Sequence, residues 1–191
     1  PPVANLAPPE FSRLAYLGPT GTFTEQALFT QGDLTGLDLR PAPSIPDVFR
    51  QVVTGEADLG FAAIENSIEG SVNITQDTLT FDTDLLIQRE VISEIELNLL
   101  AHAGVGLGDV EMVLSFPHAI AQCRTWLAEN LPEAATGAAN STADAARQVA
   151  EDRPTATAAI ATSGAAQSYG LEILVPDIED HPENETRFVL V

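Results

Sequence analysis

Short apolar runs alternate with helix-forming segments along almost the whole chain, and this alternation constrains the fold more than any other feature. Residues 14–17, 59–64 and 158–161 are apolar runs of strand length, and each ends in a polar turn. Such β-α-β alternation is typical of an α/β protein whose strands run mostly parallel. We therefore expect an α/β fold with mostly parallel sheets and flanking helices.

Helix start signals fall between these runs. Thr22 followed by Glu25 forms a capping box, which predicts a helix to about residue 30. Ser44 with Pro46 in the first turn predicts a second helix, which Gly55 is placed to end. Further helices are expected from Pro117, over residues 140–152, and in a short segment that ends at residue 170.

The order of the segments indicates two lobes. Strand–helix units fill residues 14–84 and 95–170, and the end of the chain returns as a loop and a strand. We expect a loose Pro-rich leader at 1–12, a first lobe at about 13–90 plus 176–191, and a second lobe at about 91–175. A chain that builds one lobe, crosses to a second and returns leaves a cleft, and polar strand–helix junctions are expected to face it.

Composition excludes several classes of partner. The chain has 191 residues, with 28 acidic and 8 basic side chains, all of them arginine, and a net charge of −20. It has no basic stripe for nucleic acid or anionic membrane and no apolar run of spanning length. Because residues 1–10 lack a basic and then apolar pattern, we expect no secretory signal in them. An acidic surface without lysine suits high salt, but a GC-rich genome also depletes lysine, so both origins stay open.

Cysteine and histidine give no sign of a metal or redox site. Cys123 is the single cysteine, which fits a reducing cytoplasm, and its helical context predicts a small core residue. His102, His118 and His181 lack metal-ligand spacing, and we expect His118 to be a first-turn surface residue. The glycines of 104–108 do not lie between a strand and a helix, so they form no dinucleotide fingerprint.

The strongest candidate site is the segment 184–188, which reads Asn-Glu-Thr-Arg-Phe and runs into the apolar end of the chain. We expect a strand here, so that Thr186 and Arg187 point to opposite faces and only one looks directly into a given cleft. A guanidinium binds a carboxylate with two parallel hydrogen bonds, and a hydroxyl donates to a neighbouring oxygen. Taken alone, however, the pair is more typical of a strand edge and a surface arginine.

Two other junctions are candidates. Glu65, Asn66 and Ser67 follow the buried run 59–64, and ligands of open α/β sheets bind at the carboxyl ends of strands, although such residues also cap helices. The turn at 18–22 leads into a helix, whose first N–H groups attract anions. Such turns are nevertheless common in α/β proteins that bind nothing there.

Four segments together resemble the prephenate dehydratase family, over about residue 13 to the end. They are Gly18-Pro19-Thr20-Gly21-Thr22-Phe23-Thr24-Glu25, Glu65-Asn66-Ser67-Ile68-Glu69-Gly70, Ser115-Phe116-Pro117-His118-Ala119-Ile120-Ala121-Gln122-Cys123 and Asn184-Glu185-Thr186-Arg187-Phe188. The resemblance implies two α/β lobes like those of type II periplasmic binding proteins, with the active site in the cleft. The positions that match the family's important residues are Glu65, Asn66, Ser115, Gln122, Thr186, Arg187 and Phe188.

The chain also departs from the family. The family usually has His and then Pro-Gln where this chain has Phe116, Pro117 and His118. The ACT regulatory domain that typically follows, with its Gly-Ala-Leu and Glu-Ser-Arg-Pro motifs, is absent from this sequence, as is a fused chorismate mutase helix. These departures concern detail around the site and regulation rather than the reaction.

The resemblance implies decarboxylating dehydration of prephenate to phenylpyruvate, a lyase step of phenylalanine biosynthesis. Aromatisation drives the reaction, so neither a metal nor an organic cofactor is expected. The implied catalytic residues are Thr186, Glu65, Asn66, Ser115 and Gln122. The resemblance implies Arg187 and Phe188 as substrate-binding residues. The polar junctions expected to face the cleft add Thr20, Gly21, Thr22, Ser67, Asn140, Thr162 and Ser163. Prephenate is the expected partner, without nucleic acid or membrane, in a cytoplasmic homodimer or homotetramer.

Two residues compete for the proton transfer, and two other functions stay open. Thr186 can hydrogen-bond the departing hydroxyl while Arg187 holds a carboxylate. Glu65 is the rival acid, because desolvation beside the apolar run 61–64 favours a protonated carboxyl; otherwise it is a structural acceptor of loop N–H groups. Arogenate, which carries an amine where prephenate has a keto group, is the alternative substrate. A non-catalytic amino-acid-binding module would share the two lobes and the arginine.

Overall fold

The computed structural model describes residues 11–152 and 156–191, so all but the last two residues of the expected leader at 1–12 lie outside the described residues. The chain divides into two compact units. The first holds the described residues up to Pro19, then Phe23–Glu94 and Asn184–Val191; the second holds Thr20–Thr22 and Ile95–Glu183. Residues 176–183 and the short turn at Thr20–Thr22 therefore group with the second unit.

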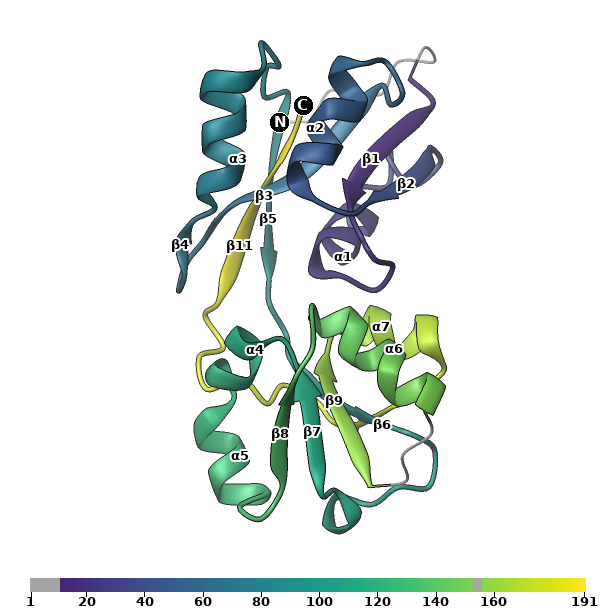
Figure 1. The fold of residues 1–191 in the computed structure, drawn as a ribbon, viewed down its shortest axis with the longest axis vertical. Helices are drawn as coiled ribbons and strands as arrows, with labels where there is room; N and C mark the ends of the chain where they lie inside the picture. Colours follow the sequence, from purple (N-terminus) through teal and green to yellow (C-terminus); the bar gives the residue numbers. More distant parts are fainter. Residues whose placement is uncertain (1–10, 153–155) are drawn as a thin grey trace. The chain divides into compact units, whose positions relative to one another are not determined.

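The first unit is a sheet in the order β2-β1-β3-β11-β5, with β4 paired to β3 (Figure 1). β1 runs parallel to both β2 and β3, whereas β11 runs antiparallel to both β3 and β5. The strands are β1 (Arg13–Leu17), β2 (Asp38–Ala42), β3 (Leu59–Asn66), β4 (Gly70–Ser71), β5 (Arg89–Glu94) and β11 (Glu185–Leu190). The helices are α1 (Phe23–Phe29), α2 (Ile45–Val53) and α3 (Asn73–Asp77), which continues as a π-helical turn at Thr78–Asp82.

The second unit is a sheet in the order β10-β6-β9-β7-β8. β7 runs parallel to β8 and β9, and β6 runs antiparallel to β9 and β10. The strands are β6 (Asn98–Ala101), β7 (Met112–Ser115), β8 (Ala135–Ala138), β9 (Thr157–Ala161) and β10 (Glu172–Val175). The helices are α4 (Pro117–Gln122), α5 (Arg124–Asn130), α6 (Thr142–Asp152) and α7 (Ser163–Tyr169), with a 3-10 turn at Leu107–Asp109.

Both sheets follow the same plan. In each, one strand (β1 or β7) is flanked by two parallel strands, and a strand that follows a crossing from the other unit (β11 or β6) pairs antiparallel with one of these two (β3 or β9). The chain returns to the first unit by β11, and it enters the second unit by β6. The predicted α/β class with two sheets is confirmed, but the prediction of mostly parallel sheets is wrong. Local β-α-β alternation does not reveal that a strand from a distant part of the chain will pair antiparallel within the sheet.

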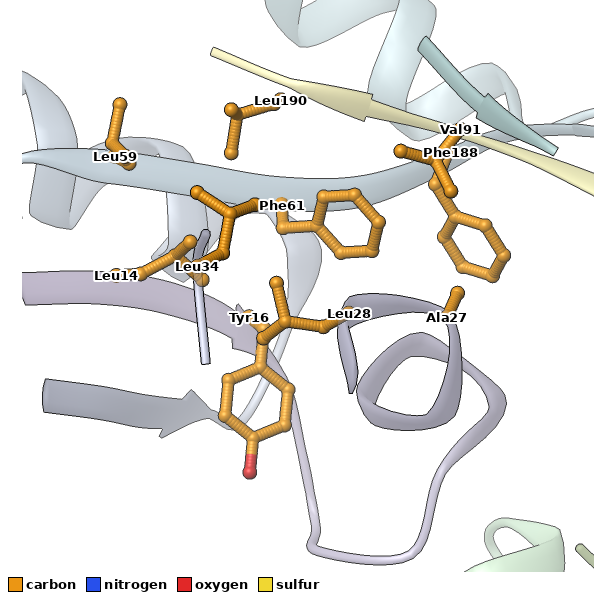
Figure 2. Close-up of a cluster of buried hydrophobic side chains, with 10 residues drawn as sticks. All are labelled: Leu14, Tyr16, Ala27, Leu28, Leu34, Leu59, Phe61, Val91, Phe188 and Leu190. Carbon is orange, nitrogen blue, oxygen red and sulfur yellow. The ribbon is translucent and has the colours of Figure 1, made fainter. Parts of the chain in front are cut away.

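The two faces of the first sheet are buried by different helices. Tyr16 of β1, Phe61 of β3 and Phe188 of β11 pack with Leu28 of α1 in one cluster, which Figure 2 shows. The Phe61 and Phe188 rings stack with centroids 5.3 Å apart, and burial of such a ring contributes about 1.5–3 kcal/mol. On the opposite face, Val191 packs with residues of β3 and α2. Phe188 and Leu190 of β11 therefore enter one layer, and Val191, the residue that follows β11, enters the other.

Most local signals are confirmed, with two exceptions. Ser44 caps α2 by accepting from the Asp47 N–H, and α7 ends at Tyr169, before Gly170, as expected. The helix predicted from Pro117 is interrupted at Cys123, so that it forms α4 and α5. Cys123 is fully buried, which confirms it as a core residue, and burial raises the pKa of its thiol well above the ordinary range. The strand β2 was not foreseen.

Candidate functional site

The side chain of Thr186 is held by an asparagine on the neighbouring strand. Thr186 of β11 lies opposite Asn66 of β3 in the ladder. Asn66 Nδ2 donates to Thr186 Oγ1 at 2.9 Å and to Asn184 Oδ1 at 2.8 Å, and it lies 3.2 Å from the Glu185 carbonyl oxygen. Thr186 and Asn184 are both buried, with 8% and 1% of their surfaces exposed. The strand junction therefore forms a tight polar cluster at one end of the sheet.

The loop after β3 fixes the other end of the Asn66 amide. Asn66 Oδ1 accepts from the backbone N–H groups of residues 68 and 69, at 3.0 Å each. Ser67 Oγ accepts from the Glu185 N–H at 2.9 Å and donates to Asn184 Oδ1 at 3.3 Å. The Ser67 N–H donates in turn to the Glu185 carbonyl. These bonds hold the loop and the start of β11 in one arrangement.

This arrangement sets the role of the Thr186 hydroxyl. A hydroxyl has one hydrogen and two lone pairs, and here one lone pair is taken by the Asn66 N–H. Within residues 11–152 and 156–191, no acceptor is hydrogen-bonded to the Thr186 hydroxyl hydrogen. The hydroxyl hydrogen can therefore be donated to a group outside the described residues. That geometry suits a hydrogen bond to an oxygen of a bound small molecule.

Glu65 and Arg187 form a pair on the other face of the same strands. They lie opposite each other in the ladder, and Arg187 Nε is 3.6 Å from Glu65 Oε2. Arg187 Nη1 also lies 3.4 Å from Glu90 Oε1 on β5. The side chain of Glu65 is 51% exposed, so it is not desolvated as its proposed role as an acid requires. The guanidinium expected to hold a substrate carboxylate is shared between two protein carboxylates instead.

A small hollow lies on this Arg187 face. It has a volume of about 140 Å³ and is lined by Glu65, Ser67, Ile92, Glu185 and Arg187. Its lining carries two carboxylates and one guanidinium and therefore has no net positive charge, so the hollow is not suited to bind a dianion. Thr186 is not among its lining residues.

Phe188 does not lie at a substrate surface. Only 1% of its surface is exposed, and its ring packs on Phe61 beside Ala27 of α1, as Figure 2 shows. Because strand residues two apart share a face, Phe188 anchors the same face of β11 from which Thr186 projects. The expectation that Phe188 binds substrate is replaced by a packing role.

The candidate residues of the second unit are also fixed by hydrogen bonds. Ser115 at the end of β7 is fully buried, and its Oγ donates to the Ile160 carbonyl of β9 at 2.7 Å. Thr162 caps α7 by accepting from the Ala165 N–H at 2.9 Å, and it donates to the Gly21 carbonyl at 2.8 Å. Both hydroxyl hydrogens are thus committed to backbone carbonyls. These two residues hold backbone in place rather than offering a donor.

The turn at Thr20–Thr22 packs on α7. Tyr169 Oη donates to the Thr20 carbonyl at 2.9 Å. Gly21 has φ of +85°, and a Cβ at this position would lie 2.9 Å from the Ala165 Cα. Thr22 is buried, whereas the side chain of Thr20 is exposed. A glycine is therefore needed where this turn meets the helix.

The remaining candidates lie at other edges of the second unit. Asn140 and Ser163 are exposed, and the Asn140 N–H donates to Asp144 Oδ2 at 3.3 Å. Gln122 is half-buried at the end of α4, and its carbonyl accepts from the Asp180 N–H. His118 is exposed in the first turn of α4, as expected. Over the described ranges, no group of three or more His, Cys, Asp or Glu residues is arranged to hold a metal.

The structure brings together Asn66, Ser67 and Thr186 in the first unit, and Gly21 with Thr162 in the second. Asn184 is the residue that sequence reasoning missed, although it lies in the segment judged most informative. Its position at the centre of the cluster depends on the pairing of β3 with β11, which no local pattern gives. In the described part of the chain, no helix is long and apolar enough to cross a membrane.

The two units share one mixed α/β sheet topology, and a buried threonine hydroxyl is held where two strands meet. These features define a class of two-unit α/β proteins with a polar site at the ends of their strands. Residues 14–191 match the prephenate dehydratase family. The chain therefore belongs to that family.

Individual relatives agree with this assignment. The prephenate dehydratase of Mycolicibacterium vanbaalenii is 42% identical over 191 residues, which cover 93% of this chain and 61% of that protein. A solved prephenate dehydratase from Arthrobacter aurescens, in complex with L-Phe, superposes with a TM-score of 0.86 at 38% identity, over 93% of this chain and 59% of that one. The structure of GqqA, described as a novel type of quorum quenching acylase, gives a TM-score of 0.82 at 30% identity, over 93% and 62%. The chain thus spans about three fifths of the length of these relatives.

Proposed function

We propose that this chain catalyses the prephenate dehydratase reaction, the decarboxylating dehydration of prephenate to phenylpyruvate. The bond from the ring to its carboxylate breaks, and its electron pair enters the ring as CO2 leaves. The opposite ring C–O bond breaks with its electron pair on the hydroxyl oxygen, which takes one proton and leaves as water. The protein must therefore bind a dianion and assist the departure of hydroxide.

The observation that carries this proposal is the hydrogen bond from Asn66 to Thr186 Oγ1. It occupies the hydroxyl as an acceptor and leaves its hydrogen to be donated to the departing oxygen. A positioned proton donor contributes about 10²–10⁴-fold to a rate. Asn66 and Ser67 act as positioning residues, since their hydrogen bonds hold the loop and strand beside Thr186.

The second unit contributes binding and support in this proposal. Thr20, Thr22, Asn140 and Ser163, which lie at polar turns between strands and helices, are the candidates for direct contact with prephenate, together with Gln122 at the end of α4. Ser115, Gly21 and Thr162 support these turns through their backbone hydrogen bonds and packing. Glu65 and Arg187 are left as a surface pair that joins β3 to β11.

We also propose a cytoplasmic homodimer or homotetramer that engages neither nucleic acid nor membrane. A net charge of −20 opposes binding to both kinds of anionic surface, and a single buried cysteine fits a reducing compartment. Light scattering coupled to size-exclusion chromatography measures the assembly directly. A monomer across the micromolar range would contradict the oligomer.

An assay with parallel substrates tests the proposed reaction. Phenylpyruvate release from prephenate is measured beside phenylalanine release from arogenate and hydrolysis of an N-acyl amide, the last because one relative is described as an acylase. We expect prephenate to be the preferred substrate, with turnover that needs no added metal. Binding of prephenate without turnover would favour an amino-acid-binding module of the same fold. Hydrolysis of the amide alone would overturn the proposal.

A further inference from the structure

We infer that Asn184 is a positioning residue for the reaction, because, together with the backbone N–H groups of residues 68 and 69 that donate to Asn66 Oδ1, it fixes which end of the Asn66 amide faces Thr186. The inference rests on the proposed function for its kinetic part only. Asn184 itself is 1% exposed and its oxygen faces Asn66 and Ser67, so it acts through these neighbours rather than on the substrate.

The argument begins with the two ends of an asparagine amide. The nitrogen end can only donate, and the oxygen end can only accept. The Asn66 nitrogen faces the Asn184 Oδ1 and the Glu185 carbonyl, which are both acceptors. Turning the Asn66 amide over would set its oxygen against these two acceptors, so the observed orientation is strongly favoured.

The orientation of Asn66 then decides what the Thr186 hydroxyl does. With the nitrogen toward Thr186, the hydroxyl must accept, and its hydrogen is directed elsewhere. With the oxygen toward Thr186, the hydroxyl would donate to Asn66 and lose its role as a donor to substrate. Removal of the Asn184 oxygen eliminates its 2.8 Å hydrogen bond from Asn66 Nδ2. This is the shortest of the contacts that keep the Asn66 nitrogen toward Thr186.

Burial increases the importance of this contact. The Asn184 oxygen accepts a second hydrogen bond, from Ser67 Oγ, so it is itself held in place. Water has only partial access to replace the lost acceptor, because Asn184 and Thr186 are buried and Asn66 is half-buried. Hydrogen bonds in such sites are also stronger than the same bonds in water.

A double-mutant cycle separates positioning from general support. We compare the unchanged chain, Asn184→Ala, Asn66→Ala and the double variant for kcat and KM with prephenate. We expect Asn184→Ala to lower kcat by about tenfold with KM little changed, since one hydrogen bond to the half-buried Asn66 amide is lost. In the Asn66→Ala background the same substitution should change kcat by less than about twofold, because its target is already gone.

Controls keep the test decisive. Asn184→Ser enters the same cycle in case Asn184→Ala does not fold, and Asn130→Ala, on the exposed end of α5, should leave kcat unchanged. Equal losses from the Asn184 substitutions in both backgrounds would overturn the inference, because they would show a purely structural role.

A measurement without substrate distinguishes the two proposals. In a ¹H–¹⁵N spectrum, the side-chain amide signals of Asn66, assigned by their loss in Asn66→Ala, should be sharp and protected from exchange. They should shift and lose protection in the Asn184 variants. If the unchanged chain fails to turn over prephenate, the proposed function fails, and these signals alone decide whether Asn184 orients Asn66. Unchanged Asn66 signals would overturn the inference.

Discussion

Thr186 and Arg187 are neighbours in the chain, yet their side chains leave β11 on opposite faces of the sheet. Thr186 joins Asn66 in a buried cluster on the face that Phe188 anchors, whereas Arg187 lies between Glu65 and Glu90 on the other face. The two residues therefore have separate roles. Thr186 carries the proposed chemistry, and Arg187 joins three strands by ion pairs.

Glu65 is predicted to be dispensable for the proton transfer. Glu65→Gln removes the acid but keeps the size of a side chain that is 51% exposed and paired with Arg187 on the face away from Thr186. We expect most of the activity to remain, with a similar dependence of kcat on pH. A pH–rate profile measures this, and loss of one limb together with a collapse of kcat would return Glu65 to the role of acid.

Gly21→Ala is predicted to destabilise the chain more than Gly55→Ala. Both glycines have positive φ, so each substitution carries a backbone penalty of about 1 kcal/mol or more. A Cβ at Gly21 would also lie 2.9 Å from the Ala165 Cα, whereas a Cβ at Gly55 meets nothing within 4 Å. Denaturant unfolding of both variants gives the comparison, and equal losses of stability would contradict the packing described for Gly21.

The ion pair of Asp33 with Arg89 is predicted to contribute stability that depends on pH. Arg89 donates to both oxygens of Asp33, at 2.9 and 2.6 Å, and only 8% of its side chain is exposed. These hydrogen bonds lower the pKa of the Asp33 carboxyl, despite an opposing effect of burial. A lowered pKa means that the pair stabilises the fold above the ordinary carboxyl range and that this stability is lost as the pH falls through the folded-state pKa.

Asp33→Asn tests this ion pair. At pH 7 the variant should lose about 1.5–3 kcal/mol of unfolding free energy, because Arg89 loses its hydrogen bonds to a charged carboxylate. Below about pH 4 the difference from the unchanged chain should shrink. Asp38→Asn is the control, since its pair with Arg40 is largely exposed and should matter little. A difference that stays constant with pH would contradict the assignment.

The sequence predicts the fold well where a local pattern suffices. Apolar runs locate strands such as β1, β3 and β9, and Ser44 with Pro46 locates the start of α2. The strand β2 escapes detection because Asp38, Arg40 and Pro41 interrupt its apolar pattern. The antiparallel insertion of β11 and β6 escapes for a different reason, since it joins segments far apart in the chain.

The candidate site likewise has features that a local pattern predicts and features that depend on long-range strand pairing. Strand alternation alone places Thr186 and Arg187 on opposite faces. The register of β11 on β3 is needed to show that Thr186 meets Asn66 while Arg187 meets Glu65. The same register reveals Asn184, because its contact with Asn66 spans 118 positions of the chain. Long-range pairing of this kind leaves no signal in a single sequence.

The central claim is that the Thr186 hydroxyl assists the departure of the ring hydroxyl. Thr186→Val keeps a β-branched side chain of similar shape but removes the donor, and Thr186→Ser keeps the donor. Steady-state turnover of prephenate by these two variants is the most direct test, with thermal melts to show that both remain folded.

We predict that Thr186→Val lowers kcat by about 10²–10⁴-fold with KM little changed, because the lost interaction is made only in the transition state. Thr186→Ser should stay within about tenfold of the unchanged chain, since Asn66 can still donate to its hydroxyl. A folded Thr186→Val variant with near-normal kcat would contradict the account.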